Sequence, residues 1–248
     1  MASQWKHALI IGASSGIGAE LARQLAKQGC SVALVARREP ELKALAELIQ
    51  ANGGPTARLY IHDVKNTEAV SQLFQQIAHD MGGLDLVIYA SGVMPQIASG
   101  EYSLEKDRAM VEINFMGAIA WLNEAAQRFE KAQTGTIVGI SSVAGERGRQ
   151  SMPVYSASKA ALTAYLEALR NRVARYGVKV VTVKPGPVST PMTEGMKLPL
   201  LIPADRAASE ILAAASRGAV NAYVPGVWRY IFLILRNIPS FLFRKLKL

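Results

Sequence analysis

The sequence has few of the residues that build disulfide frameworks and metal sites. Cys30 is its single cysteine, which excludes an internal disulfide and a cysteine-rich zinc site, so we expect it to pack as a small hydrophobe at the start of a strand. His7, His62 and His79 are scattered without the spacing of metal ligands, and we expect no metal. The N-terminal segment has too few apolar residues for a signal-peptide core, which predicts a cytoplasmic protein.

Low-complexity tracts and solenoid repeats are also missing. The 248 residues are half hydrophobic, which suits one α/β domain rather than two small ones. Acidic residues are missing from the last 24 positions, although the formal charge of the whole chain is +9. A basic balance suits nucleic acid or an anionic membrane. The cations of this last stretch are Arg229, Arg236, Arg244, Lys245 and Lys247.

Tyr155 and Lys159 begin a long apolar-periodic segment that predicts a helix to about Tyr176. Residues four apart on a helix share a face, so the Lys159 ammonium lies one turn from the phenol. A tyrosine that exchanges protons near neutral pH needs a pKa about 3 units below its usual value of about 10, and a nearby cation shifts the pKa in that direction. A surface pair on an ordinary helix is the alternative. Ser141-Ser142 and Asn114 upstream, together with a glycine-rich turn, favour the catalytic interpretation.

The glycine-rich turn follows a buried strand predicted at residues 7–11 and precedes a helix running to about residue 28. Glycines in this order let the backbone turn tightly and approach a pyrophosphate, to which the helix N-terminus offers N–H groups. A turn without a ligand is the alternative. The expected dinucleotide contacts here are Gly12, Ser14, Ser15, Gly16, Ile17 and Gly18.

Two arginines, Arg37 and Arg38, follow the second predicted strand, at residues 31–35. A site that prefers NAD usually carries a carboxylate there for the ribose hydroxyl, whereas arginine suits a 2′-phosphate. Because no acid occurs before Glu39, we expect NADP(H), with NAD(H) as the less favoured cofactor and Arg37 as the expected contact. Alternatively, both arginines merely begin the next helix.

Strands and helices alternate along the rest of the chain. This pattern predicts a parallel sheet with helices on both faces and a ligand at the carboxyl ends of its strands. We expect strands at 58–62, 84–89, 135–140, 179–184 and 222–224, and helices at 40–52, 67–79, 103–130, 155–176 and 204–217.

Polar residues stand at several expected strand ends. Asp63 suits either the adenine amino group or a turn cap, and Ser91-Gly92 and Ser141-Ser142 follow two other strands. Asn114 falls inside a helical run, where its amide requires a partner or an ordered water.

The segment from Met192 to Ile202 is rich in Met, Leu and Pro and has little regular patterning. Beside a dinucleotide site it suits a lid, and ordinary loop packing is the alternative. The residues that would form its apolar inner face are Met192, Met196, Leu198, Leu200 and Leu201.

The tail, residues 226–248, follows a catalytic domain expected at 1–225. Its polar stripe consists of Arg229, Arg236, Ser240, Arg244 and Lys247, opposite Trp and Phe residues. Arg236, Asn237 and Pro239 interrupt it, so it is too short to span a bilayer, and Pro239 should kink or divide the helix. We expect a basic amphipathic helix on an anionic inner membrane surface. Burial in a homodimer or homotetramer contact, or over the substrate pocket, is the alternative.

These motifs together resemble the short-chain dehydrogenase/reductase family over residues 6–225. The resemblance rests on the glycine turn, Asp63, Asn114, the set of Ser142, Tyr155 and Lys159, and Pro185-Gly186 followed by Thr190. It implies a doubly wound Rossmann-type sheet of about seven strands, a nicotinamide cofactor, and reduction of a ketone or oxidation of a secondary alcohol.

By position, the resemblance implies that Tyr155 donates the proton, Ser142 bonds the carbonyl oxygen, Lys159 holds the nicotinamide ribose and lowers the tyrosine pKa, and Asn114 supports a relay water. The implied cofactor contacts outside the glycine turn are Arg37, Asp63, Val64, Ser91, Gly92, Tyr155, Lys159, Pro185, Gly186, Val188 and Thr190. Ile11 and the run Tyr89-Ala90-Ser91-Gly92 depart from the family pattern and remove hydrogen bonds that brace the cleft.

A narrower likeness links residues 141–150 and the tail to bacterial reductases of 2-keto sugars on polyprenyl-phosphoryl pentoses. It implies that Arg147 and Arg149 meet a substrate phosphate; a solvated charged loop is the alternative. The leading hypothesis is therefore an NADPH-dependent reductase of an apolar or lipid-linked carbonyl compound. Its rivals are a soluble 3-ketoacyl or xenobiotic carbonyl reductase and a non-catalytic dinucleotide-binding redox sensor. Nucleic-acid binding is disfavoured because the cations lie among aliphatic residues.

Overall fold

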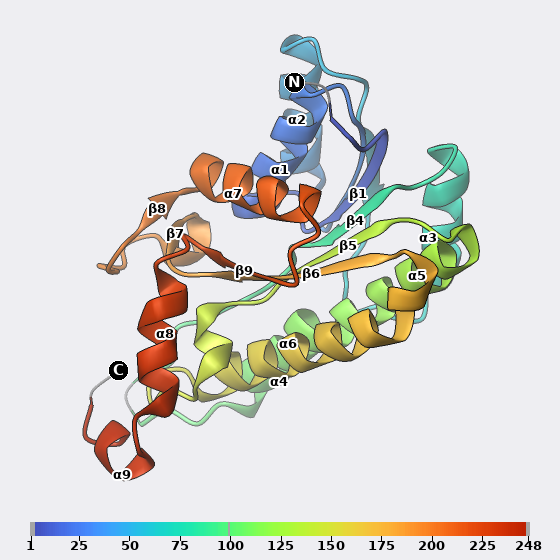
Figure 1. The fold of residues 1–248 in the computed structure, drawn as a ribbon. Coiled ribbons are helices and arrows are strands. Elements are labelled where there is room, and N and C mark those ends of the chain that lie inside the picture. The colour runs from blue at the N-terminus through green and yellow to red at the C-terminus, as the bar shows by residue number, and fades with distance from the viewer. Residues whose placement is uncertain (1–2, 99, 247–248) are drawn as a thin grey trace.

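A seven-stranded parallel sheet forms the centre of the protein. The computed structural model describes residues 3–98 and 100–246, and within them the strand order is β3-β2-β1-β4-β5-β6-β9 (Figure 1). The expected doubly wound α/β fold is confirmed. The strands of this sheet are β1 (His7–Ile11), β2 (Ser31–Ala36), β3 (Arg58–Ile61), β4 (Leu86–Tyr89), β5 (Thr136–Ile140), β6 (Lys179–Pro185) and β9 (Asn221–Val224).

Helices cover both faces of the sheet because consecutive strand residues point to opposite sides. On β1, Ile10 faces a core with α1 (Gly16–Lys27), α2 (Glu39–Ala51) and α7 (Ala204–Ser216). Ile11 faces the other core, with α3 (Val70–Asp80), α5 (Gly117–Ala132) and α6 (Pro153–Val173). Burial on both faces explains why the strands are continuous apolar runs rather than alternating ones.

The chain reverses its direction across the sheet between β1 and β4. From β1 it moves outward through β2 and β3, then returns to place β4 on the other side of β1. In sheets of this kind a crevice opens at the carboxyl ends of the strands where the order reverses. The glycine turn after β1 and Ser91-Gly92 after β4 lie at this position.

One expected helix, at residues 103–130, is interrupted. It consists of α4 (Leu104–Val111), a π-helical turn at Glu112–Met116 and α5. The Tyr89 hydroxyl donates a hydrogen bond of 2.6 Å to the Ile113 carbonyl inside that turn. Gly117 lies so close that a Cβ there would be 2.6 Å from the same hydroxyl. The turn widens the helix at the buried Asn114, and π-bulges of this kind often occur at functional sites.

The expected lid carries more regular structure than its sequence suggested. β7 (Val188–Ser189) pairs with β8 (Ile202–Pro203) in a small second sheet, and a single 3₁₀ turn covers Pro191–Thr193. Met192, Leu200 and Leu201 are exposed rather than turned inward, so the prediction of an apolar inner face is wrong for these three residues.

The tail forms two helices, α8 (Trp228–Asn237) and α9 (Ser240–Phe243), divided at Pro239 as expected (Figure 1). No helix among the described residues is long and apolar enough to cross a membrane. Trp228 and Phe232 pack with Val143 against the body of the protein. The prediction that tryptophan and phenylalanine oppose the cations on a free face is therefore wrong for these two residues.

Candidate active site

Asn114 is buried, and both the oxygen and the nitrogen of its side-chain amide make hydrogen bonds. Its Oδ1 accepts a hydrogen bond of 2.8 Å from the Val93 N–H, and its Nδ2 donates to the Val93 carbonyl at 3.0 Å and to Ser158 Oγ at 3.1 Å. The expectation that a buried mid-helix asparagine finds partners is confirmed. These bonds fix the loop after β4 to α6, which carries Tyr155 and Lys159.

Lys159 lies in the same buried cluster. Its Nζ donates a hydrogen bond of 3.0 Å to the Ile140 carbonyl at the end of β5. A Cβ on Gly92 would lie 3.4 Å from both Lys159 Nζ and Asn114 Oδ1, so the three residues meet at one point. Burial lowers the pKa of Lys159 from 10.5 to about 8. The amine is therefore a cation near neutral pH that gives up its proton more easily than a surface lysine.

Tyr155 is only 8% exposed, and this burial raises the pKa of its phenol. The neighbouring Ser142 hydroxyl and the charge of Arg149 act in the opposite direction but do not outweigh burial. Lys159 Nζ lies 5.9 Å from the ring centroid and is directed to the Ile140 carbonyl. The prediction that Lys159 acidifies the phenol is therefore wrong for the protein's own groups, and the phenol keeps its proton near neutral pH.

Ser142 follows β5 and faces the end of β6. Its hydroxyl accepts a hydrogen bond of 3.0 Å from the Ala144 N–H and lies 3.5 Å from the Pro185 carbonyl. The 3.5 Å contact is too long to hold the hydroxyl firmly. Ser142 thus keeps a proton that it can donate beside Tyr155.

The glycine turn leaves no room for side chains. Gly12 has a φ of +93°, and a Cβ on Gly18 would lie 2.1 Å from the Gly12 carbonyl oxygen. Ser15 precedes α1, whose first turn carries no acidic residue. A close backbone approach and an exposed helix N-terminus without a competing carboxylate fit the pyrophosphate of a dinucleotide.

Two arginines sit at the adenosine end of this turn. Arg38 donates hydrogen bonds to Ser14 Oγ at 2.9 Å and Ser15 Oγ at 2.7 Å, while Arg37 Nη1 lies 3.4 Å from Asp63 Oδ2. Arg37 is the contact expected from the sequence, but Arg38 is the arginine that reaches the serines of the turn. Side chains alternate in direction in extended backbone, and this signal could have identified the second arginine.

Two of the residues expected to contact the cofactor outside the glycine turn, Thr190 and Ser91, lie against that turn. A Cβ on Gly16 would lie 3.0 Å from Thr190 Cγ2, and one on Gly12 would lie 2.5 Å from the Ser91 backbone nitrogen. Val188, which follows β6 in the chain, and Val64, which follows β3, are both buried. Gly186 lies under Trp228, whose indole nitrogen would be 1.9 Å from a Cβ at that position. Trp228 of the tail therefore lies next to a residue expected to contact the cofactor.

The loop after Ser142 holds the tail. Glu146 accepts a hydrogen bond of 2.5 Å from Lys184 Nζ and one of 3.0 Å from the Tyr223 hydroxyl, and lies 3.7 Å from Arg236. Arg147 donates hydrogen bonds to the Leu235 carbonyl at 2.6 Å and the Ile238 carbonyl at 2.5 Å.

Arg147 also stacks on the ring of Phe243, 3.8 Å from its centroid. Its guanidinium therefore caps the end of α8, which differs both from the predicted substrate-phosphate contact and from a solvated loop. Arg149 lies 5.5 Å from the Phe232 ring centroid and acts electrostatically on Tyr155. A phosphate contact for Arg149 stays a prediction.

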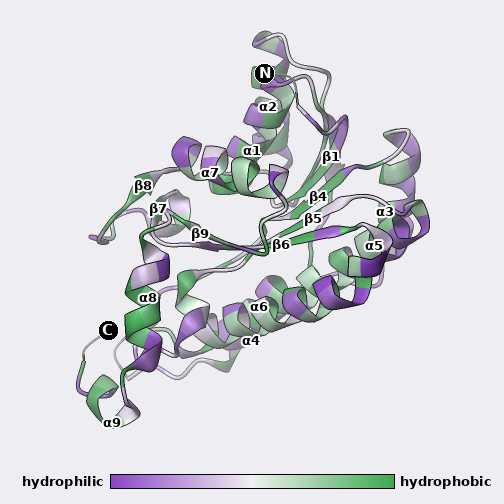
Figure 2. Cartoon of the chain, viewed as in Figure 1, coloured by the Kyte–Doolittle hydropathy of each residue, from purple (hydrophilic) through white to green (hydrophobic). Residues whose placement is uncertain are grey.

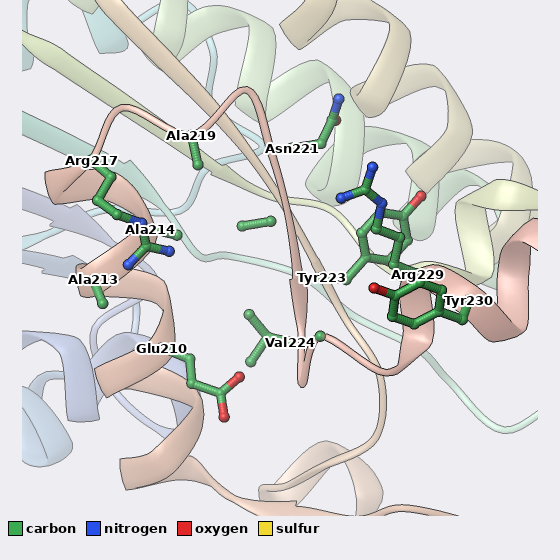
Figure 3. Close-up of a pocket in the computed structure, with 12 residues that line it drawn as sticks. Glu210, Ala213, Ala214, Arg217, Ala219, Asn221, Tyr223, Val224, Arg229 and Tyr230 are labelled. Carbon is green, nitrogen blue, oxygen red and sulfur yellow. The ribbon is translucent and has the colours of Figure 1, made fainter.

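An open groove of about 470 Å³ lies at a different place, along the edge strand β9 (Figure 3). Glu210 of α7 and Arg217, the residue after α7, line one side, and Arg229 and Tyr230 of α8 line the other. It shares no lining residue with the cluster around Tyr155. Within residues 3–98 and 100–246, no group of three or more histidine, cysteine, aspartate or glutamate side chains could hold a metal ion.

Known proteins resemble this chain over most of its length. The model of the short chain dehydrogenase family matches residues 6–199. An uncharacterized oxidoreductase of Staphylococcus saprophyticus is 34% identical over 221 residues, which covers 88% of this chain and 94% of the relative. A protein of Arabidopsis thaliana named 11-beta-hydroxysteroid dehydrogenase-like 2 is 33% identical over 95% of this chain and 78% of its own length. A crystal structure of a short-chain type dehydrogenase/reductase from Mycobacterium marinum is 26% identical, with a TM-score of 0.80 over 88% of this chain and 93% of the other.

Proposed function

The chain belongs to the short-chain dehydrogenase family and is thus an oxidoreductase, and from this premise we propose that it reduces a ketone to a secondary alcohol with NADPH. The observation that carries the proposal is the convergence of Ser142, Tyr155 and Lys159 on the crevice beside the glycine turn. Arg37 and Arg38 follow β2 with no acidic residue before Glu39, which supports NADPH over NADH.

The residues of the crevice suit the reductive direction. The nicotinamide, when bound, supplies a hydride to the carbonyl carbon. Tyr155 then transfers its phenolic proton to the carbonyl oxygen as negative charge develops there. Ser142 donates a hydrogen bond to the same oxygen, and Lys159 supplies a positive charge one helical turn away. The raised pKa of Tyr155 keeps the phenol protonated, as a proton donor requires.

We propose an apolar or lipid-linked carbonyl compound as the substrate. Support comes from Met192, Leu200 and Leu201, which expose apolar surface on the β7–β8 segment beside Thr190. NADPH oxidation measured against 2-ketones of increasing chain length tests this. We expect KM to fall with chain length; equal KM values for short and long ketones would contradict it.

Arg37 and Arg38 should determine the choice between the two cofactors. We expect the double variant Arg37→Ala/Arg38→Ala to weaken NADPH binding by roughly 100-fold, because charge-assisted hydrogen bonds to a phosphate are lost, and NADH binding by less than about threefold. Fluorescence titration with each cofactor measures both affinities. The control is Arg58→Ala, because Arg58 begins the neighbouring strand β3 and lies at the opposite edge of the sheet from the residues that follow β2. Equal losses for NADPH and NADH would show that the phosphate is bound elsewhere.

Burial of Lys159 predicts a pH-dependent cost in stability. Below pH 8 the amine is protonated in the folded and the unfolded chain, so the full cost of burying the ammonium is present. Between pH 8 and 10.5 the folded chain releases the proton first, so this cost disappears as pH rises.

Lys159→Met removes the buried ammonium. We expect the free energy of unfolding of this variant, relative to the natural protein, to fall by about 2 kcal/mol between pH 7 and pH 10. Urea unfolding at both pH values measures it. Lys131→Met, at an exposed position, is the control. A difference independent of pH would contradict the buried-cation interpretation.

A further inference from the structure

The tail presents an apolar surface that the body of the protein does not cover. Trp228 and Phe232 use one side of α8 for packing. Residues on the opposite side are between 46 and 68% exposed and define the outer face of the tail. The outer face consists of Tyr230, Leu233 and Ile234 on α8 and Phe241 and Leu242 on α9.

Within α8 the outer face follows from helical spacing. Tyr230, Leu233 and Ile234 are separated by three and four positions, which places them on one side of α8. Figure 2 shows hydrophobic residues on α8 and α9, and in Figure 1 both helices project from the same side as the β7–β8 segment. Met192, Leu200 and Leu201 of that segment are exposed apolar residues as well.

Cations flank the outer face, and the tail itself carries no acidic residue, although Arg236 lies 3.7 Å from Glu146 of the body. Arg229 and Arg236 lie along one side of α8, and Arg244 and Lys245 follow α9; all four are exposed. A second copy of the chain docking face to face would bring these cations against their own equivalents. An anionic lipid surface instead offers charge of the opposite sign and an apolar interior for the five outer-face residues.

We propose that the tail docks the protein on an anionic lipid surface, with the outer face inserted among the lipids and the flanking cations among the headgroups. Tyr230, near the start of α8, then lies at the boundary between the apolar and polar layers of the membrane, where tyrosine is enriched.

The docked tail also positions the active site. α8 is held by Arg147 at the Leu235 and Ile238 carbonyls and by Trp228 against Val143, the residue after Ser142. Because α8 packs next to the loop after Ser142, docking would hold the active site close to the lipid surface, from which an apolar ketone could enter. This last step rests on the proposed function, whereas docking itself does not.

Sedimentation with vesicles tests the docking. We expect the full chain to pellet with phosphatidylglycerol/phosphatidylcholine vesicles and to remain in solution with phosphatidylcholine alone. The variant Leu233→Ser/Ile234→Ser should weaken binding at least tenfold, since two buried aliphatic side chains are lost. Leu48→Ser/Leu104→Ser, at exposed apolar positions elsewhere, should bind as the natural protein does.

The contribution of the tail cations to vesicle binding is tested with two matched triple variants. Arg229→Gln/Arg244→Gln/Lys245→Gln should weaken binding roughly 100-fold, or about fivefold for each cation near the surface. Arg236 is retained because it lies beside Glu146. Lys6→Gln/Lys27→Gln/Lys131→Gln removes the same charge from exposed positions away from the tail and should have little effect.

Three results would overturn the proposal. The first is a natural protein that stays in solution with anionic vesicles. The second is equal loss of binding in both charge triples, which would indicate attraction by net charge alone. The third is a lower molar mass in light scattering for Leu233→Ser/Ile234→Ser, which would assign the outer face to a second copy of the chain.

A turnover measurement separates docking from catalysis. With vesicles present, Leu233→Ser/Ile234→Ser should lose reduction of membrane-dissolved 2-tridecanone but keep reduction of water-soluble cyclohexanone. Failure of the natural protein to reduce either ketone, while it still binds vesicles, would count against the proposed function and not against docking. Retention of both at natural rates, with binding lost, would overturn delivery of the ketone from the lipid surface.

Discussion

Replacing Tyr155 with phenylalanine should lower kcat at least about 1,000-fold, because the site loses its proton donor. The ring stays in place, since phenylalanine fills the same buried space next to Met110 and Ala144. Removing one buried hydroxyl should leave the free energy of unfolding within about 1 kcal/mol of the natural value. Steady-state NADPH oxidation and a fluorescence titration with NADPH measure turnover and cofactor binding separately.

The expected signature is loss of kcat with NADPH affinity changed by less than about threefold, since the phenol acts only as charge develops. Tyr165→Phe is the matched control. Tyr165 lies on the same helix, and its hydroxyl bonds Asn123 at 2.9 Å on an exposed surface. This control should keep full turnover. Activity within tenfold of natural in Tyr155→Phe would remove the proton-donor assignment.

Much of the fold could be predicted because each strand is a short apolar run bounded by turn residues. The alternation of β1, α1, β2 and α2 predicts a parallel sheet covered by helices. The continuous apolar runs of the strands, which indicate burial on both faces, predict the same sheet. The π-helical turn around Asn114 could not be predicted in this way. It depends on the Tyr89 hydroxyl reaching the Ile113 carbonyl, a contact between residues 24 positions apart.

The site was predictable where one local motif fixes the geometry, as at Gly12 and Gly18. It was less predictable where a side chain has several possible hydrogen-bond partners. Tyr155 and Lys159 share a helical face, but only the structure shows that the ammonium is directed to the Ile140 carbonyl. Helical spacing likewise gave an apolar side to the tail, yet it could not show which of those residues the body would bury.

Replacing Glu146 with glutamine should destabilise the protein by roughly 3–5 kcal/mol, because it leaves Lys184 buried without a counter-charge. Both side chains of this pair are about nine-tenths buried, and Lys184 Nζ lies 2.5 Å from Glu146 Oε1. Arg236 of the tail loses its nearby carboxylate in the same variant. Thermal and urea unfolding measure the loss, and vesicle sedimentation reports whether the tail still docks.

The pair of Lys106 and Glu101 provides the control, because its N–O distance is also 2.5 Å but both side chains are more than a quarter exposed. We expect Glu101→Gln to cost far less stability than Glu146→Gln, since solvent screens an exposed pair. The double variant Glu146→Leu/Lys184→Met should recover most of the stability lost in Glu146→Gln, because it removes both buried charges. Equal costs for Glu146→Gln and Glu101→Gln would mean that burial does not strengthen the pair. In that case the attachment of the tail to the loop after Ser142 would depend on Arg147 and on the packing of Trp228 against Val143.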